Sequence, residues 1–166
     1  DPYFTMVIDV YYRGALPEAS ERRVAFGEPG AFESSATKDK DRFFLEELPI
    51  HIDYKTVESI DEILKRKYDL YWIFKGSGTY MFYRMERGTV LYDRAGWMRS
   101  VLKRIQEFPD DFWIGLRATF QSKMEHFLSD LGAAALREDV YFYRSALVEF
   151  LRYAAASLFV INHRFE

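Results

Sequence analysis

Two stretches near the start of the chain have the hydrophobic pattern of β-strands. Residues 4–12 form an aromatic and β-branched run, which predicts a nearly buried strand. Residues 48–54 alternate apolar and polar side chains, which is typical of a strand with one buried face. Between them, residues 18–26 predict a short helix, and the polar residues 31–41 predict an exposed loop.

The middle of the chain predicts short elements separated by glycine. Thr56 is expected to cap a helix over residues 57–67. Residues 69–74 are aromatic and fit either a strand or a buried turn of helix. Residues 79–87 predict a helix that Gly88 ends, and residues 89–92 (Thr-Val-Leu-Tyr) predict another short strand.

The last seventy residues have helical spacing throughout. Residues 95–108 predict one helix, and Pro109 predicts the start of a second, in which Gly132 marks a bend or an end. A final helix is predicted over 140–161, antiparallel to the second. The expected apolar stripes are Trp113, Leu116, Phe120, Met124, Phe127 and Leu131, and then Val140, Tyr143, Leu147, Phe150, Leu151, Ala154, Leu158 and Ile161.

These elements predict an α+β fold, with a small mixed β-sheet followed by an antiparallel helical bundle. We expect an α/β domain over residues 1–93 and a helical bundle over residues 94–166. Because the chain opens inside a predicted strand and stops just after a helix, we also expect sequence to be missing on both sides.

Composition and charge exclude several function classes. The 166 residues include no cysteine, which excludes disulfide frameworks, zinc-thiolate sites and thiol nucleophiles and fits a cytoplasmic location. No apolar run reaches about 18 residues, so no membrane-spanning helix and no membrane partner are expected. The net charge of −3 gives no electrostatic reason to expect binding to duplex nucleic acid.

Asp53 is the first candidate site residue. In strict alternation it shares one strand face with His51 and Lys55, while Ile50 and Ile52 lie on the other. A face that carries a carboxylate, an imidazole and an ammonium group can bind a metal or a phosphate. The alternative is the ordinary solvent face of an edge strand.

Asp9 is the second candidate, because it interrupts the otherwise apolar run of residues 4–12. Burying a carboxylate is costly unless it is paired with a cation, so either an Arg or Lys partner or a metal ion is expected. If Asp9 and Asp53 lie on adjacent strands and face the same side, their carboxylates converge, which is the basic requirement of a Mg²⁺ site.

Two glycine turns and one acidic motif are weaker candidates. The stretch 75–79 (Lys-Gly-Ser-Gly-Thr) could hold a phosphate at a helix N-terminus, although an ordinary helix start is the more common reading. Lys75 and Arg87 each lie beside a glycine turn and are assigned, with His51, to substrate binding. Asp39 and Asp41 form the chain's Asp-x-Asp, which we interpret as part of the solvated loop.

The order of these pieces resembles the nucleotidyltransferase-fold (polymerase-β-like) proteins that carry a C-terminal helical bundle, in a little-characterised subgroup. The resemblance covers residues 4–165. It is carried by Asp53 at the end of its strand, by residues 87–96 (RGTVLYDRAG) and by residues 159–165 (FVINHRF).

The resemblance implies a site and a reaction. In that superfamily a Gly-Ser turn holds the triphosphate, and an Asp-x-Asp pair and a third carboxylate hold two Mg²⁺ ions. Asp53 matches the third carboxylate, but the opening strand carries Asp9 alone. Either the Gly-Ser and Asp-x-Asp motifs lie upstream of residue 1, or this strand has lost its metal ligands.

The function implied is transfer of a nucleoside monophosphate from an NTP, with ATP expected first, to a hydroxyl group of a small molecule or a protein. The implied cofactor is Mg²⁺, as one ion or two, with Asp53 and Asp9 as metal ligands and catalytic residues. The alternative is an inactive nucleotidyltransferase fold that binds a nucleotide or a partner. The acceptor is not identified by the sequence, which also leaves a homodimer open.

Overall fold

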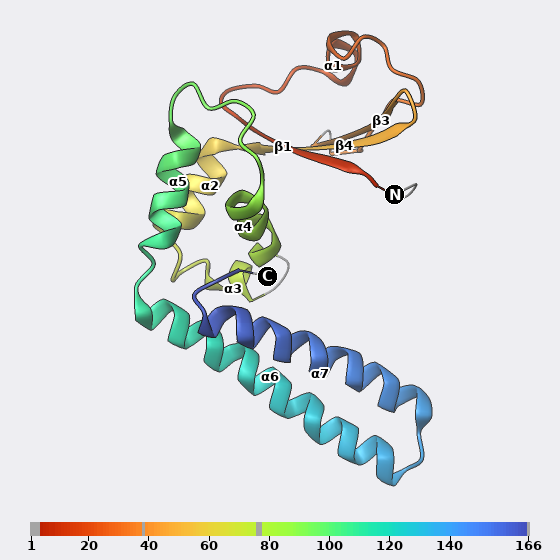
Figure 1. Cartoon of the computed structure of the whole chain (residues 1–166), viewed down its shortest axis with the longest axis vertical. Coiled ribbons are helices and arrows are strands. Elements are labelled where there is room, and N and C mark those ends of the chain that lie inside the picture. The colour runs from red at the N-terminus through yellow and green to blue at the C-terminus, as the bar shows by residue number, and fades with distance from the viewer. Residues whose placement is uncertain (1–3, 38, 76–77, 166) are drawn as a thin grey trace. The chain divides into compact units, whose positions relative to one another are not determined.

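The computed structural model describes residues 4–37, 39–75 and 78–165. The protein chain forms two compact units (Figure 1). The sheet unit comprises residues 1–65 and the helical unit residues 66–166. Within the described residues there are four strands in one mixed sheet and seven helices, so the predicted α+β class is confirmed. The domain boundary predicted after residue 93 lies inside the helical unit and stays a prediction.

The sheet unit is built on a four-stranded sheet with the strand order β1-β4-β3-β2. Strand β1 pairs in parallel with β4, whereas β3 pairs antiparallel with both β2 and β4. The elements are β1 (Met6–Tyr12), α1 (Ala19–Ala25), β2 (Glu33–Ser34), β3 (Lys40–Leu45), β4 (Leu48–Thr56) and α2 (Val57–Lys65). Thr56 accepts a hydrogen bond from the backbone N–H of Ser59 and so caps α2 as predicted.

The two faces of β4 divide as its alternating sequence predicts. Ile50, Ile52 and Tyr54 are buried in a core that also contains Phe43 of β3. The residues between them, His51, Asp53 and Lys55, are half-buried on the opposite face. Leu16 and Phe32, from the segment that links β1 to β3, pack against the core. This segment therefore covers the apolar face of the sheet. It does not cover the face that carries His51, Asp53 and Lys55.

The exposed loop predicted over residues 31–41 is wrong in part, because β2 and the start of β3 lie there. The prediction rested on polarity, but Asp41 is fully buried and Ser34 is half-buried. Buried partners that lie far away in the sequence satisfy these polar side chains, and a local pattern does not reveal them.

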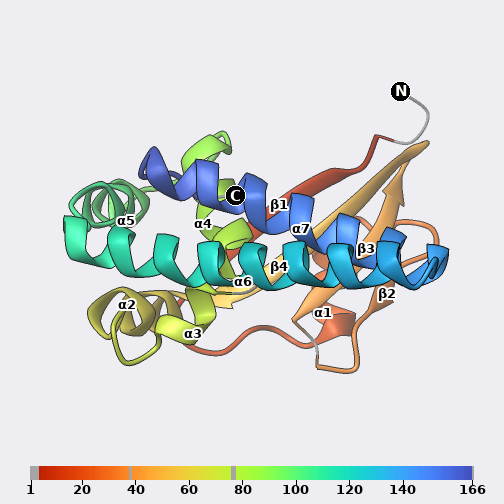
Figure 2. The same ribbon diagram turned by 90° about the horizontal axis from the view of Figure 1, so that it is seen from below.

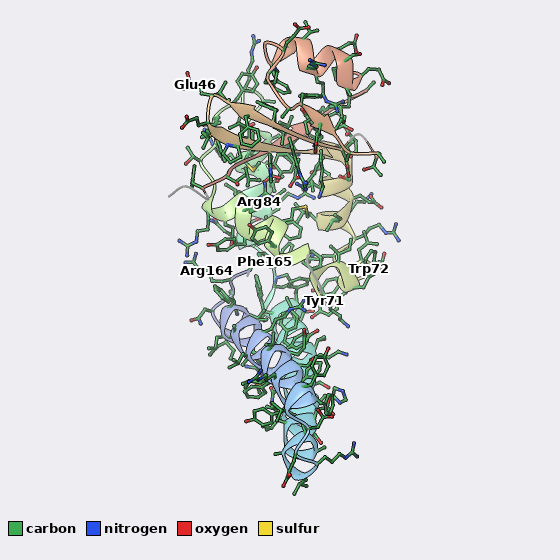
Figure 3. The ribbon with its side chains drawn as sticks, turned by 90° about the vertical axis from the view of Figure 1, so that its right-hand side faces the viewer. Glu46, Tyr71, Trp72, Arg84, Arg164 and Phe165 are labelled. Carbon is green, nitrogen blue, oxygen red and sulfur yellow. The ribbon has the colours of Figure 1, made fainter. Side chains whose placement is uncertain are left out.

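The helical unit begins with α3 (Tyr71–Phe74), α4 (Gly78–Arg87) and α5 (Trp97–Gln106), which surround a core of aromatic side chains. Residues 71–74 thus form a short helix and not a strand, in which Phe74 is buried while Trp72 is 69% exposed. Phe74 is central, because its ring lies 5.0–5.1 Å from those of Phe82 and Phe112. Phe165, which is labelled in Figure 3, lies on the segment after the last helix. Its ring packs against those of Phe82 and Trp113.

Helices α6 (Asp110–Leu136) and α7 (Val140–Ile161) lie side by side and run antiparallel, which confirms the predicted helix pair (Figure 2). Pro109 is the N-cap of α6, and Asp110 and Asp111 occupy its first turn, where carboxylates interact favourably with the helix dipole. Asp139 caps α7, because its side chain accepts a hydrogen bond from the N–H of Phe142.

Three predictions for the helical unit are wrong. Residues 89–92 pair with no strand among the described residues, and Leu91 and Tyr92 are each 80% exposed, because a short apolar run forms a strand only beside a partner. For Gly132 the predicted helix end is wrong, because residues 133–136 are strong helix formers and the helix continues to Leu136, whereas the alternative of a bend stays a prediction. The stripe predicted to pack α7 against α6 is also wrong in part, since two of its residues, Leu151 and Leu158, are exposed.

None of the helices in the described part of the chain is both long and apolar enough to cross a membrane.

Candidate functional site

Asp9 and Asp53 lie directly opposite each other on neighbouring strands. They are partners in the parallel register of β1 and β4, between the pairs Ile8–Ile52 and Val10–Tyr54. Residues opposite each other in a sheet point to the same face, so both carboxylates lie on the polar face of the sheet. Their side chains are only 15% and 22% exposed. The convergence that the sequence predicted conditionally is therefore present.

Lys55 joins the two carboxylates. Its ammonium nitrogen lies 2.6 Å from Oδ1 of Asp9 and 3.8 Å from Oδ2 of Asp53. On the other side, the ammonium nitrogen of Lys40 lies 3.9 Å from Oδ1 of Asp53. Lys55 is 24% exposed, so its contact with Asp9 is partly shielded from water and is stronger than a surface ion pair.

The pair of carboxylates meets a minimal requirement for Mg²⁺. This ion binds through one or two carboxylates and takes its other ligands from water and substrate phosphates. Such an ion at Asp9 and Asp53 would take the place of the Lys55 ammonium group, which now neutralises them. In the described ranges, no group of three or more His, Cys, Asp or Glu side chains could hold a metal ion.

His51 lies on the same face of β4 as Asp53, two residues earlier in the strand. Its register partners are Val7 of β1 and Arg42 of β3. Two residues along a strand span about 7 Å, so His51 is placed to contact a ligand bound beside Asp53.

Lys75 and Arg87 belong to the helical unit. Lys75 is the C-cap of α3, and its ammonium group lies 4.9 Å from the ring centre of Tyr71. Arg87 is the last residue of α4 and is exposed. Gly76 and Ser77, the centre of the predicted phosphate turn, lie outside the described residues. The assignment of Lys75 and Arg87 to substrate binding stays a prediction.

The sequence did not reveal the most buried polar cluster of the sheet unit, which consists of Arg22, Asp41 and Tyr54. The Arg22 guanidinium donates two hydrogen bonds to Asp41, from Nε to Oδ2 at 2.7 Å and from Nη2 to Oδ1 at 2.8 Å. The hydroxyl of Tyr54 donates to Oδ2 of Asp41 at 2.8 Å. Arg22 is 4% exposed and Asp41 is fully buried. Interpreting Asp41 as a solvated residue was therefore wrong.

The pKa values of this cluster follow from burial and charge. Burial alone would raise the pKa of Asp41, but hydrogen bonds from Arg22 and Tyr54 lower it below its ordinary value. Burial, together with the hydrogen bond to Asp41, raises the pKa of the Tyr54 hydroxyl. Asp41 is therefore held in its ionised form, and both of its carboxylate oxygens accept hydrogen bonds from residues of the same unit. One signal in the sequence was available, since Asp41 shares the alternation of Phe43 in β3.

The fold and this geometry define an α+β protein with a carboxylate pair on the polar face of a small mixed sheet. Residues 78–166, more than half of the chain, match the family model described as a domain of unknown function (DUF4037). The chain belongs to this family. The match covers α4 to α7, so Asp9 and Asp53 lie outside it. No curated protein and no solved structure matches the chain.

Proposed function

We propose that this protein is a Mg²⁺-dependent nucleotidyltransferase-like enzyme that transfers a nucleoside monophosphate from an NTP to a hydroxyl group of a small molecule or a protein. The observation that carries the proposal is the register pairing of Asp9 with Asp53, which brings two carboxylates together on one face of the sheet. The resemblance of Asp53 and residues 87–96 to the nucleotidyltransferase fold supports the same function.

The reaction assigns a role to each carboxylate. The oxygen of the acceptor hydroxyl attacks the α-phosphorus of the NTP, and the bond from that phosphorus to the bridging oxygen breaks, so that pyrophosphate leaves. The hydroxyl proton passes to Asp9 or Asp53, which lie beside each other on the sheet. Mg²⁺, when bound to this pair, would neutralise phosphate charge and hold the triphosphate for in-line attack.

Lys55 is the residue of this site that must change partner. Its ammonium group contacts both carboxylates, at 2.6 Å and 3.8 Å. If Asp9 and Asp53 held a divalent cation, the flexible stem of Lys55 would allow its ammonium group to contact a phosphate oxygen of the substrate instead. Lys55 would then keep a negatively charged partner in both states.

The test is Asp53→Asn, which removes the charge with little change of shape. We expect Mg²⁺-dependent binding of a non-hydrolysable ATP analogue to fall at least about tenfold, a change of 1.4 kcal/mol in binding free energy. The melting temperature should stay within a few degrees, because repulsion between the carboxylates is relieved while a contact at 3.8 Å is lost. Asp69→Asn is the matched control, since Asp69 forms an exposed ion pair with Arg66 in the helical unit.

One result would contradict the proposal. If the wild-type protein binds no nucleotide in the presence of Mg²⁺ and Asp53→Asn lowers the melting temperature by several degrees, Asp53 is a structural ion-pair partner.

The second candidate function is that of an inactive nucleotidyltransferase fold that binds a nucleotide or a partner. The contacts of Lys55 favour it, because a lysine that permanently neutralises both carboxylates leaves no role for a metal ion. Nucleotide binding that is unchanged by EDTA would favour this function over catalysis.

A further inference from the structure

The polar face of the sheet extends beyond the carboxylate pair, onto strand β3. Lys40 is the register partner of Asp53, and Arg42 is the register partner of His51. Because residues opposite each other in a sheet point to the same face, Lys40 and Arg42 share the face of Asp53. Asp41 lies between them in β3 and is buried on the apolar face, as the alternation of a strand requires. Two cationic side chains therefore border the candidate site on the side away from β1.

Arg42 is the residue of this border that is open to a ligand. Its side chain is exposed, and within the described part of the chain its guanidinium group forms no ion pair and no hydrogen bond. Glu33, its register partner on β2, is exposed as well and does not pair with it. The planar guanidinium fork binds phosphate and carboxylate groups through two parallel hydrogen bonds. Arg42 therefore has the exposure and the chemistry of an anion-binding residue.

Cationic side chains lie at both ends of the carboxylate pair along the strands. Lys55 follows Asp53 by two residues on β4, whereas the row of Arg42 and His51 precedes it by two. The two rows are about 13 Å apart, since a strand rises about 3.3 Å per residue. The proposed reaction needs two such positions, because the attacking hydroxyl and the leaving pyrophosphate lie on opposite sides of the α-phosphorus. With Lys55 on a phosphate oxygen of the nucleotide, the row of Arg42 is left for the second substrate.

We propose that Arg42, with Lys40 and His51 beside it, binds an anionic group of the acceptor. The acceptor is then a small hydroxyl compound that carries a phosphate or carboxylate group within about 7 Å of its hydroxyl, which is the spacing of two residues along a strand. This inference rests on the proposed function, because it names the class of the second substrate. The acceptor oxygen bonds to the α-phosphorus, pyrophosphate leaves, and the hydroxyl proton passes to Asp53, the carboxylate nearer to Arg42.

The charges of the site favour an anionic acceptor over a neutral alcohol. The ammonium nitrogen of Lys40 lies 3.9 Å from Oδ1 of Asp53, and its side chain is 54% exposed. A divalent cation at Asp9 and Asp53 would neutralise the carboxylates that now attract this lysine. Lys40 would then contact the anion held by Arg42, so an anionic acceptor should bind more tightly once the metal and the nucleotide are in place.

The first test uses inorganic phosphate as the probe and the full chain. At constant ionic strength, phosphate should raise the melting temperature of the wild-type protein in a saturable way, both in EDTA and with Mg²⁺ and a non-hydrolysable ATP analogue. Arg42→Met should weaken phosphate binding at least about tenfold, because a charged, hydrogen-bonded contact is lost. Arg23→Met is the matched control, since it removes the same charge from an exposed position on α1. Acetate in place of phosphate distinguishes a carboxylate acceptor from a phosphorylated one.

The second test separates this site from the nucleotide site. Calorimetry should show that Arg42→Met binds the ATP analogue in Mg²⁺ with the affinity of the wild-type protein, whereas Asp53→Asn should not. Phosphate should also bind together with the ATP analogue and should not displace it. A residue that contacts the acceptor alone gives this combination, and a residue of the triphosphate site does not.

Three results would overturn the inference. If the ATP analogue binds but phosphate binds equally to wild type and Arg42→Met, or to neither, the acceptor site lies elsewhere and the proposed function stands. If Arg42→Met also loses the ATP analogue, Arg42 belongs to the nucleotide site. If phosphate binding depends on Arg42 but the wild-type protein binds no nucleotide, the proposed function fails and Arg42 has no acceptor to bind.

Discussion

Arg22 and Asp41 form a buried, two-point ion pair that joins helix α1 to strand β3. Both atoms of the Asp41 carboxylate accept hydrogen bonds from the same guanidinium group, and Tyr54 of β4 donates a third. Arg22 also donates to the carbonyl oxygen of Pro17 and to the hydroxyl of Ser34. One arginine thus holds the segment that covers the sheet to two of its strands, and it does so on the face opposite to Asp9 and Asp53.

The first prediction concerns this pair. Arg22→Met leaves Asp41 buried without its cation, and we expect a loss of about 3–5 kcal/mol in the free energy of unfolding. Urea denaturation followed by circular dichroism would measure it. The control is Arg23→Met on the same helix, where the side chain is exposed and a change within about 0.5 kcal/mol is expected. Equal stability of the two variants would show that the pair contributes little.

The second prediction is that this ion pair makes the free energy of unfolding depend on pH in the acidic range. The pKa of Asp41 is lower in the folded protein than its ordinary value, which in unfolded chains is about 3.9. A carboxylate of this kind stabilises the fold above the unfolded pKa, and the stabilisation is lost as the pH falls through the folded pKa.

Urea midpoints of the wild-type protein should therefore fall as the pH is lowered below about 4. The double variant Arg22→Met, Asp41→Leu should show a shallower fall over the same range. If the urea midpoints of the wild-type protein and the double variant fall in parallel with pH, carboxylates other than Asp41 produce the whole effect.

The third prediction tests Lys55 as the cation of the candidate site. Lys55→Met leaves Asp9 and Asp53 facing each other, and the lost charged contact should cost about 1–3 kcal/mol in EDTA. Millimolar Mg²⁺ or Mn²⁺ should then raise the melting temperature of this variant more than that of the wild-type protein. Lys103→Met is the control, because the side chain of Lys103 is 74% exposed. A variant that loses stability but gains none from either metal would show that the pair does not bind divalent cations.

The fourth prediction concerns the turn between β3 and β4, where Glu46 has a φ of +55° (Figure 3). A side chain in this left-handed region costs about 1–2 kcal/mol, which glycine avoids. Glu46→Gly should raise the free energy of unfolding by about 0.5–1 kcal/mol after the entropy cost of glycine. Glu47, the other turn residue, lies outside that region, so Glu47→Gly should lower it. Thermal unfolding of both variants checks the opposite signs.

The sequence predicts the parts of the fold that depend on strict alternation. Ile50 and Ile52 on one face of β4, and Asp53 on the other, follow from a period of two, and the convergence of Asp53 with Asp9 needs only that the strands be neighbours. The alternation of Asp41 with Phe43 places both on one face of β3, but it does not identify the partner that makes burial of a carboxylate possible, because Arg22 lies 19 residues away in the chain. A local polar pattern carries no information about a distant partner.

Helix α7 shows a different limit. Its side chains are apolar almost all around, so a period of 3.6 does not select one face. The predicted stripe therefore combined Phe150, which faces α6, with Leu151 and Leu158, which face outward. The ambiguity arises because apolar side chains lie on the outward side of α7 as well as on the side that packs on α6.

The parallel pairing of β1 with β4 has a consequence for how the chain acquires its structure. Strands β3 and β4 are joined by two residues, so their hairpin can close within microseconds of synthesis. Strand β1 must wait, because its partner residues lie 44 positions further along the chain. Until residue 56 has left the ribosome, β1 lacks β4, the strand that it pairs with in the described sheet, and Asp9 lacks its register partner Asp53. The candidate site is thus assembled in the final step of forming the sheet, when a loop of more than forty residues closes.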